Sequence, residues 1–307
     1  MRTNPPTIGI VTITYNSGNV IHPFMESMIT QTFKDFKLYI IDNISSDNTI
    51  AMIEKFRDPR VELIQNTENV GVAAGNNQGM RRAMEDGCPY IMLINNDVVF
   101  EETLFEKLLQ SIQEHRDYAL ITCKMMYESD PERIWYAGSK WKKWKGYMAP
   151  HQGQKEIDKG QFDKIKTVDY APTCMVMMQR AVIEKIGYMD EKYFAYYDDT
   201  DYFYRISKQS DFKILYYPDV QFYHKVGGLT QSKSGSMSRF KFGNFHIRLS
   251  TRNKVYYLKK QKSAIGYLNI LYFLVRMNLR FLFSGKYRVN FETWRLLNAS
   301  YLEGLKM

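Results

Sequence analysis

Three acidic residues, Asp198, Asp199 and Asp201, stand within four positions of one another in a stretch rich in tyrosine and phenylalanine. Adjacent carboxylates in an apolar setting repel each other, which raises the pKa of at least one of them. A carboxylate of this kind can act as a general base near neutral pH. Asp201 and Arg205 have the spacing of an ion pair on one helix face, so we assign Asp201 a supporting role. The sequence favours Asp198 and Asp199 for the chemistry, and helix capping is their alternative role.

A second chemical signal is Asn95-Asn96-Asp97, which directly follows the apolar run Tyr90–Ile94. The run predicts a buried strand, and open α/β sheets bind their ligands outside the carboxyl ends of strands. A single carboxylate can suffice for Mg²⁺ when a bound diphosphate supplies further oxygens. The alternative is that Asp97 caps a helix near Glu101.

Polar residues also follow other predicted strands. Thr14, Tyr15 and Asn16 end the strand-like run 8–14, and Asp42 and Asn43 end the run 38–42. Asp42 could accept the imide N–H of uracil or thymine, and no local structural role explains it. Asp47 is accounted for as a helix cap.

His224 ends a short strand-like segment just before Gly227-Gly228. A lone histidine is more often structural than a ligand, but this position at a strand end favours contact with a metal or a phosphate.

Gly71, Gly75 and Gly79 are spaced four residues apart, beside Asn69 and Asn76. This spacing allows either close backbone approach to a ligand or tight helix packing. The pattern is neither a dinucleotide-binding GxGxxG after the first strand nor a P-loop, which argues against a dehydrogenase and a nucleoside-triphosphatase.

The elements that must position these groups alternate strand and helix over the first 120 residues, which predicts an α/β fold with a largely parallel sheet covered on both faces. Residues 125–167 break this rhythm with tryptophans, glycines and lysines, and predict a loop or hairpin excursion. A strand over 168–179 and two strands over 212–217 and 220–223 follow. From about residue 240 the pattern is helical, so we expect a catalytic domain over 1–240 and a helical region over 241–307.

The 307-residue chain is 45% hydrophobic with a net charge of +9, and the charge is unevenly placed. From Thr230 onward there are 15 Lys and Arg against 2 Asp and Glu, whereas the preceding residues have 27 against 31. Such asymmetry suggests contact with nucleic acid or an anionic membrane, and a solvated basic face is the alternative. The three separated cysteines predict reduced buried thiols. We expect no signal peptide and no spanning segment.

Taken together, these segments resemble the family 2 inverting glycosyltransferases of GT-A fold, and most closely their bacterial rhamnosyltransferase and galactofuranosyltransferase subgroup. The resemblance covers roughly residues 7 to 260. The order and spacing of the motifs make it specific. It rests on Val11–Asn16, Asp42–Asp47, Asn69–Gly71, Ala74–Asn77, Leu93–Asp97, Tyr197–Asp201, His224 and Arg252–Asn253.

The resemblance implies a role for each position. Asp199 would be the catalytic base, with Asp198 beside it. Asp97 would bind a divalent cation, Mn²⁺ or Mg²⁺, on the donor diphosphate, with His224 as a second ligand. Asn95 departs from the aspartate that many members have there, so Asp97 would be the sole carboxylate of this motif. The nucleotide-sugar site would comprise Thr14, Tyr15, Asn16, Asp42, Asn43, Asn69, Gly71, Asn76 and Asn96.

The implied reaction transfers a sugar, L-rhamnose from dTDP-rhamnose as first expectation and a UDP-sugar as the alternative. The acceptor would be a glycan or a polyprenyl-linked glycan in bacterial cell-surface polysaccharide synthesis. The protein would be cytoplasmic and peripheral at the inner face of the membrane.

The basic C-terminal region, with its mixed aromatic and cationic residues, would either lie on anionic lipid or form a helical cap on the body or a second subunit. A non-catalytic nucleotide-sugar-binding module on the same fold remains a further alternative. Nucleic-acid binding is disfavoured, because the residues that could do chemistry lie away from the basic region.

Overall fold

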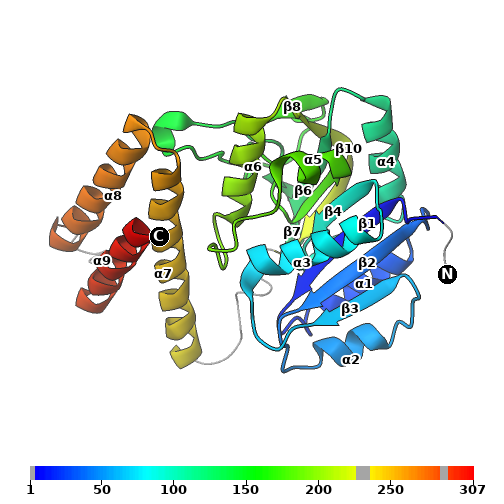
Figure 1. Ribbon diagram of the computed structural model, residues 1–307, viewed down its shortest axis with the longest axis horizontal. Coiled ribbons are helices and arrows are strands. Elements are labelled where there is room, and N and C mark those ends of the chain that lie inside the picture. The colour runs from blue at the N-terminus through cyan, green and yellow to red at the C-terminus, as the bar shows by residue number, and fades with distance from the viewer. Residues whose placement is uncertain (1–3, 226–235, 284–289) are drawn as a thin grey trace.

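A mixed sheet with helices on both faces forms the body of the protein, and three further helices stand beside it (Figure 1). The structure, a computed structural model, describes residues 4–225, 236–283 and 290–307. Gly227 and Gly228, noted in the sequence after His224, lie outside the described residues. The fold class expected from the sequence, α/β with a helical C-terminal extension, is confirmed.

The sheet and its helices have the following bounds. The strands are β1 (Ile8–Thr14), β2 (Phe36–Asp42), β3 (Val61–Gln65), β4 (Tyr90–Ile94), β5 (Val98–Phe100), β6 (Leu120–Tyr127), β7 (Asp130–Tyr136), β8 (Lys166–Val168), β9 (Met175–Gln179) and β10 (Ile214–His224). The helices are α1 (Ile21–Ile29), α2 (Thr49–Glu54), α3 (Gly71–Glu85), α4 (Leu104–Glu114), the 3₁₀ turn η1 (Lys143–Lys145), α5 (Arg180–Ile186), α6 (Asp198–Gln209), α7 (Ser236–Lys260), α8 (Ala264–Phe283) and α9 (Phe291–Lys306).

The sheet is parallel at one side and antiparallel at the other. Its order is β3-β2-β1-β4-β9-β6-β10-β5, and β3, β2, β1 and β4 run parallel. β9 is antiparallel to both β4 and β6, so the sheet is less uniformly parallel than its sequence rhythm indicates. The segments 212–217 and 220–223 form one strand, β10, with an irregularity between Tyr217 and Gln221.

Helix α3 packs tightly against β1 because it carries glycines at the contact. A Cβ on Gly79 would lie 2.2 Å from Cγ1 of Val11, and one on Gly75 would lie 3.2 Å from Ile13. Of the two roles open to this glycine series, helix packing therefore accounts for Gly75 and Gly79. The resulting close layer fixes the carboxyl ends of β1, β2 and β4 beside the start of α3.

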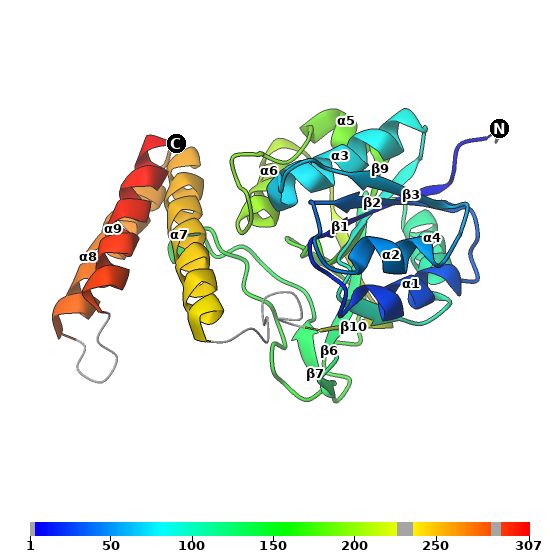
Figure 2. The ribbon, with the colours of Figure 1, turned by 90° about the horizontal axis from the view of Figure 1, so that it is seen from below.

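The excursion over residues 125–167 is a hairpin followed by a long loop. β6 and β7 pair antiparallel, and the chain then passes through η1 before it returns at β8 (Figure 2). This confirms the expected hairpin. Its loop reaches across to α7 and α8, because the hydroxyl of Tyr257 on α7 donates to the carbonyl of Tyr147 at 2.8 Å.

The C-terminal helices are joined to the body by ion pairs. Lys260 Nζ lies 2.8 Å from Asp190 and 2.9 Å from Asp201. Asp201 also accepts a hydrogen bond from Arg205 Nε at 3.1 Å, as its spacing predicted. The predicted division at residue 240 falls inside α7, which begins at Ser236. Among the described helices, none combines the length and the apolar character needed to cross a bilayer.

Candidate active site

The carboxyl ends of β1 and β2 are tied together by Asp42. Asp42 is fully buried, and its Oδ1 accepts the hydroxyl of Thr14 at 2.7 Å. The carboxylate also accepts the backbone N–H and the hydroxyl of Ser45, at 2.8 and 2.5 Å. The expectation that Asp42 lacks a structural role is therefore wrong, because the partners lie on another strand and in the next turn. Contact of Asp42 with a pyrimidine base stays a prediction.

The loop after β1 is held by Asn16 and leaves Tyr15 open. Asn16 accepts the backbone N–H of Ser46 at 2.8 Å, and its own N–H donates to the hydroxyl of Ser45 at 2.9 Å. Asn16 has a φ of 50°, a left-handed conformation that asparagine tolerates. The side chain of Tyr15 is 49% exposed, so its ring can contact a ligand above the strand ends.

Asn43 connects the end of β2 to the start of α3. Its Nδ2 donates to the carbonyl of Gly71 at 3.2 Å, and its Oδ1 accepts from Asn66 at 2.9 Å. The N–H of Gly71 donates to Oδ1 of Asn69 at 3.0 Å. Gly71 has a φ of 84°, and a Cβ there would lie 2.4 Å from the carbonyl oxygen of Phe194. This position therefore requires glycine, and it brings α3 against the chain that leads to Asp198.

Asn96 joins the end of β4 to the loop after β1. Its Nδ2 donates to the carbonyl of Ile13 at 2.8 Å and to the hydroxyl of Ser17 at 2.9 Å. Its Oδ1 is buried and finds no hydrogen-bond partner in the described part of the chain. A buried acceptor left without a hydrogen bond lowers stability by about 1–3 kcal/mol. This oxygen can therefore accept a hydrogen bond from an N–H or O–H group of a ligand. Asn76 is buried on α3.

Strand pairing brings Asp97 and His224 together. β5 runs antiparallel to β10 with Val98 opposite His224, and the N–H of Lys225 donates to the carbonyl of Asp97 at 2.8 Å. Nε2 of His224 lies 3.2 Å from Oδ1 of Asp97. Asp97 precedes a strand and α4 begins only at Leu104, so the capping alternative for Asp97 is wrong.

This pair fits a divalent cation as an incomplete ligand set. Oδ1 of Asp97 and Nδ1 of His224 are both buried without an aligned hydrogen bond from any described residue. A carboxylate oxygen beside an imidazole nitrogen suits Mn²⁺, and the oxygen also suits Mg²⁺. Over residues 4–225, 236–283 and 290–307 no group of three or more His, Cys, Asp or Glu could hold a metal ion. Further ligands would have to come from a bound diphosphate and water.

Asp198 and Asp199 lie together at the N-terminus of α6. Burial, together with the neighbouring charge of Asp199, raises the pKa of Asp198 to about 8. Asp199 is the more exposed of the two, and its Oδ2 accepts the hydroxyl of Tyr170 at 2.5 Å. Its Oδ1 accepts the backbone N–H of Thr200 at 2.6 Å. The expected rise in the pKa of one carboxylate thus falls on Asp198, and Asp199 is the carboxylate that faces out of the helix end.

A cavity of about 300 Å³ opens beside Asp199. It is lined by Met148, Ala149, Pro150, His151, Gln154, Tyr170 and Thr200. The hydroxyl of Tyr170 and the backbone N–H of Thr200, two residues of this lining, donate to Asp199, so the carboxylate lies next to the cavity wall. His151 stacks on Tyr170 with ring centroids 6.1 Å apart, and burial lowers the pKa of His151. The cavity therefore offers a neutral imidazole and aromatic rings next to a carboxylate, a lining suited to a sugar.

The loop that contains Cys174 lies near both the Asp97–His224 pair and Asp199. The N–H of Asn95 donates to the carbonyl of Cys174 at 3.1 Å. The negative charges of Asp97 and Asp199 both act on the thiol of Cys174 and, with burial as the largest cause, hold its pKa well above the usual range. Ring contacts also connect the two centres: Trp135 lies edge-on to both His224 and His151, with centroids 4.6 Å apart in each case, and His151 stacks on Tyr170, whose hydroxyl donates to Asp199.

Helix α7 fixes the turn that precedes Asp198. Tyr196 and Tyr197 both have positive φ, at 67° and 69°. Asn253 Nδ2 donates to the carbonyls of Ala195 and Tyr196, each at 2.8 Å. Strained backbone persists only where surrounding contacts hold it, and here the C-terminal region supplies them.

Sequence reasoning missed Tyr170 and His151. Tyr170 is 29 residues from Asp199, and nothing in its neighbourhood marks it as a partner of a carboxylate. His151 sits in the excursion after β7, among glycines and lysines, and no spacing connects it with the acids. Asn253 was part of the recognised pattern, but its contact with the turn was not foreseen.

The chain resembles known proteins in sequence and in structure. The family described as "Glycosyl transferase family 2" matches residues 9–187, which stops short of α6 and β10. The Escherichia coli protein named UDP-Glc:alpha-D-GlcNAc-diphosphoundecaprenol beta-1,3-glucosyltransferase WfaP is 29% identical over 133 residues, 41% of this chain and 52% of that protein. The chain spans about a third to a half of the length of the curated relatives it matches.

Two solved structures share the fold. The S. aureus TarS 1-349 complex with UDP-GlcNAc has a TM-score of 0.57 and 15% identity, covering 97% of this chain and 81% of that one. The mannosyltransferase PcManGT from Pyrobaculum calidifontis, in complex with GDP-Man and Mn2+, has a TM-score of 0.55 and 13% identity, covering 99% and 87%. The similarity of both structures extends through α6 and the C-terminal helices. With the family match over more than half of its residues, the chain belongs to glycosyl transferase family 2.

Proposed function

We propose that this protein is an inverting glycosyltransferase that moves a sugar from a nucleotide-diphosphate donor to a glycan or lipid-linked glycan in bacterial cell-surface polysaccharide synthesis. The observation that carries the proposal is the placement of Asp199. It is a half-buried carboxylate that accepts hydrogen bonds from two residues of a sugar-sized cavity, and ring contacts through Trp135 and His151 connect it to His224. A non-catalytic binding module has no need of this arrangement.

The transfer needs one base. Asp199 takes the proton from an acceptor hydroxyl in the cavity as this oxygen attacks the anomeric carbon from the face opposite the leaving diphosphate. One displacement inverts the configuration, so no second carboxylate nucleophile is required, unlike in a retaining glycosidase. The hydroxyl of Tyr170 and the N–H of Thr200 fix the orientation of Asp199 and hydrogen-bond its oxygens.

The strand-end residues hold the donor. The loop after β1 and the start of α3 would enclose the nucleoside, with Tyr15 against the base and Asn43 and Asp42 beneath it. The unpaired Oδ1 of Asn96 would accept a hydrogen bond from an N–H or O–H group of the ligand. Asp97 and His224 would hold a divalent cation, which supplies positive charge to offset the charge that develops on the leaving diphosphate.

The donor is proposed to be a pyrimidine nucleotide-sugar. The name of the E. coli relative specifies UDP-glucose, and TarS was solved with UDP-GlcNAc. These names favour a UDP-sugar, while the subgroup resemblance of the sequence favours dTDP-rhamnose. The acceptor printed for the E. coli relative is linked to diphosphoundecaprenol, which supports a polyprenyl-linked acceptor and a site of action at the inner face of the membrane.

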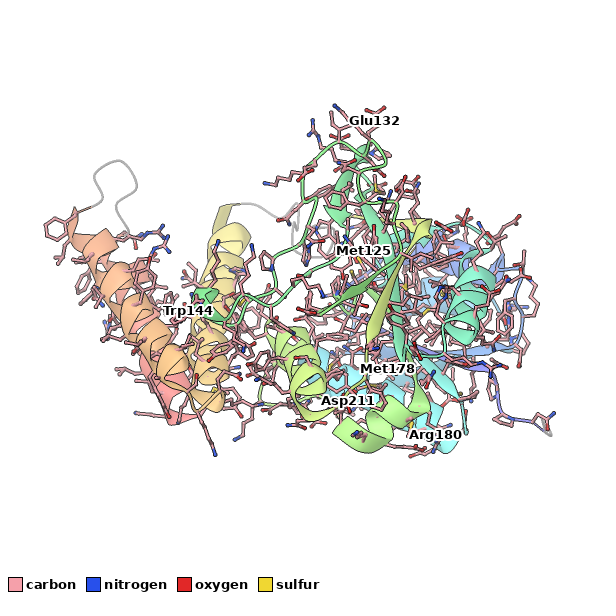
Figure 3. The ribbon with its side chains drawn as sticks, turned by 90° about the horizontal axis from the view of Figure 1, so that it is seen from above. Met125, Glu132, Trp144, Met178, Arg180 and Asp211 are labelled. Carbon is pink, nitrogen blue, oxygen red and sulfur yellow. The ribbon has the colours of Figure 1, made fainter. Side chains whose placement is uncertain are left out.

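The test is Asp199→Asn, assayed with a panel of UDP- and dTDP-sugars. Loss of the base should lower the rate of transfer roughly 10²- to 10⁴-fold, while donor affinity in calorimetry stays unchanged. The matched control is Asp211→Asn, an exposed carboxylate beyond the other end of α6 (Figure 3). Equal turnover in the Asp199 and Asp211 variants would remove the proposed base, and donor binding without transfer in the wild type would revive the binding-module alternative.

A further inference from the structure

Helix α8 presents an apolar stripe to solvent. Its exposed members include Leu268, Leu271, Tyr272, Val275, Leu279 and Leu282. Spacings of three and four residues place them on one face, while Gly266, Ile270 and Met277 are buried on the other side. A hollow of about 450 Å³ lies along the stripe. A contiguous row of exposed apolar side chains along a whole helix face marks an interaction site.

One flank of this stripe is basic. Arg276 and Arg280 follow Asn269 by seven and eleven residues, so all three lie on the same side of α8. That side is next to the loop that contains η1, because a Cβ on Gly146 would lie 3.4 Å from Oδ1 of Asn269. The η1 loop and the two arginines therefore border the stripe together.

The η1 loop adds an exposed tryptophan and further cations. The side chain of Trp144 is 80% exposed, and Lys142, Lys143 and Lys145 around it are exposed as well. Figure 3 shows Trp144 beside α8, in the view in which α8 lies in front of α9. Residues 138–148 and α8 contain no aspartate or glutamate. Two segments more than 100 residues apart thus build one apolar, aromatic and basic face.

We propose that this face, formed by the α8 stripe and the η1 loop, docks on the surface of an anionic lipid bilayer. An amphipathic helix with an apolar face and basic flanks binds in the interface plane, and tryptophan is enriched at that depth. Each basic residue near an anionic surface contributes about 1 kcal/mol, which is about fivefold in affinity.

A second copy of the chain fits this face less well. Packing α8 against α8 would bring Arg276 of both copies into one apolar contact, and α8 carries no aspartate or glutamate. Glu303 on α9 already pairs with Arg248 and Arg252. Charge complementarity therefore favours an anionic lipid surface over the packing of α8 against α8.

Docking would also serve the proposed reaction. The loop that exposes Trp144 continues within seven residues to His151, which lines the cavity beside Asp199. A lipid-linked acceptor held at the bilayer surface would have its sugar close to this cavity. The docking proposal goes beyond the transfer reaction, because lipid binding can be measured with neither donor nor acceptor present.

The experiment is flotation of the full-length protein with vesicles of equal parts phosphatidylglycerol and phosphatidylcholine, or of phosphatidylcholine alone. We expect the wild type to float with the anionic vesicles only, and to be released by added salt. Two triple variants should bind at least about tenfold more weakly. The variants are Leu271→Gln, Val275→Gln, Leu279→Gln and, separately, Lys142→Gln, Lys143→Gln, Lys145→Gln.

Matched controls make the same changes elsewhere on the surface. One control is Leu302→Gln, at an exposed leucine of α9. The other is the triple variant Lys55→Gln, Lys159→Gln, Lys164→Gln, at exposed lysines outside the proposed face. Controls that float like the wild type, together with quenching of the tryptophan fluorescence of the wild type by brominated lipid, support the proposal. Equal flotation of the triple variants and their controls would overturn it, as would a wild type that ignores vesicles and forms a dimer broken by the α8 changes.

Discussion

At the scale of single residues, the Asp97–His224 pair shows how two side chains can be set for an ion that neither binds alone. Their near atoms are 3.2 Å apart, yet Oδ1 of Asp97 is buried without an aligned donor in the part of the chain described by the structure. Burying an unpaired carboxylate oxygen is unfavourable, so a cation or a hydrogen-bond donor should contact this oxygen when the nucleotide-sugar is bound. Asn95 contributes no charge here, so a cation bound by this pair would depend on the donor diphosphate for further ligands.

This dependence predicts an ordered response to metal. Mn²⁺ alone should change the melting temperature little, whereas Mn²⁺ with a nucleoside diphosphate should raise it by several degrees more than the nucleotide with chelator. In His224→Ala the extra shift should largely disappear, while the shift caused by nucleotide alone persists. The same nucleotide shift with chelator as with Mn²⁺ in the wild type would contradict a metal role for the pair.

Asp198 predicts a dependence of stability on pH. Its pKa is about 8 in the folded protein, because it is buried beside Asp199, and far lower in the unfolded chain. The folded state therefore holds a proton that the unfolded state has lost between about pH 4 and pH 8. Across that window this group lowers the free energy of unfolding as the pH rises, because only the folded state still holds the proton.

Asp198→Asn should abolish this contribution. Denaturant unfolding at pH 6 and pH 8 should show a smaller decrease in stability for the variant than for the wild type. Asp219→Asn, at an exposed carboxylate, serves as the control and should follow the wild type. A wild type whose stability does not fall over this range would mean that Asp198 is ionised in the fold.

At the scale of elements, α7 acts as the support for the catalytic turn. Asn253 holds the carbonyls of Ala195 and Tyr196, and Arg252 Nη2 donates to the carbonyl of Lys192 at 3.1 Å. The turn is also held from the body, since the N–H of Val72 donates to the carbonyl of Phe194 at 2.6 Å. Contacts from both sides keep the N-terminus of α6, and with it Asp199, in one orientation.

Asn253→Ala should therefore impair catalysis more than binding. Two carbonyls lose their donor, which should cost about 1–3 kcal/mol of stability. The turnover number should fall several-fold while the affinity for the nucleotide-sugar is kept. The reason is that most residues proposed to bind the nucleotide-sugar lie at or just after the ends of β1, β2 and β4. Asn298→Ala, which removes a hydrogen bond within α9, is the control. Loss of donor affinity together with turnover would show a general folding defect instead.

These elements also show what sequence can and cannot predict. The ends of β1, β2 and β4 followed from apolar runs that stop at polar residues, because that pattern is local. The direction of β9 depends on pairing with β4 and β6, and no local pattern encodes it. β10 was interpreted as two strands because Pro218 and Asp219 interrupt its apolar pattern, yet pairing with β6 continues on both sides. The contacts of Asp42 with Thr14 and of Asp199 with Tyr170 form only in the folded chain, because 28 and 29 residues separate the partners.

At the scale of the whole molecule, the proposed lipid-docking face and the proposed active site share one loop. The chain from η1 to His151 exposes Trp144 at one end and lines the acceptor cavity at the other, while Tyr147 is fixed to α7 by Tyr257. This connection is short and anchored, so the distance between the bilayer surface and Asp199 is set by the fold. Docking of the protein on the bilayer would not raise the concentration of a water-soluble acceptor at the cavity. A lipid-linked acceptor, in contrast, would be confined to the bilayer surface on which the protein docks.

The two classes of acceptor should therefore respond differently to loss of the α8 stripe. In Leu271→Gln, Val275→Gln, Leu279→Gln, kcat/KM toward a polyprenyl-linked acceptor in anionic vesicles should fall at least about tenfold, because docking raises the effective concentration of that acceptor. Toward a short water-soluble analogue it should stay within about twofold, because the stripe does not contact the cavity or the strand ends. Leu302→Gln should behave as the wild type with both acceptors. An equal fall with both would assign α8 to the stability of the site, since only a lipid-docking role separates the two substrates.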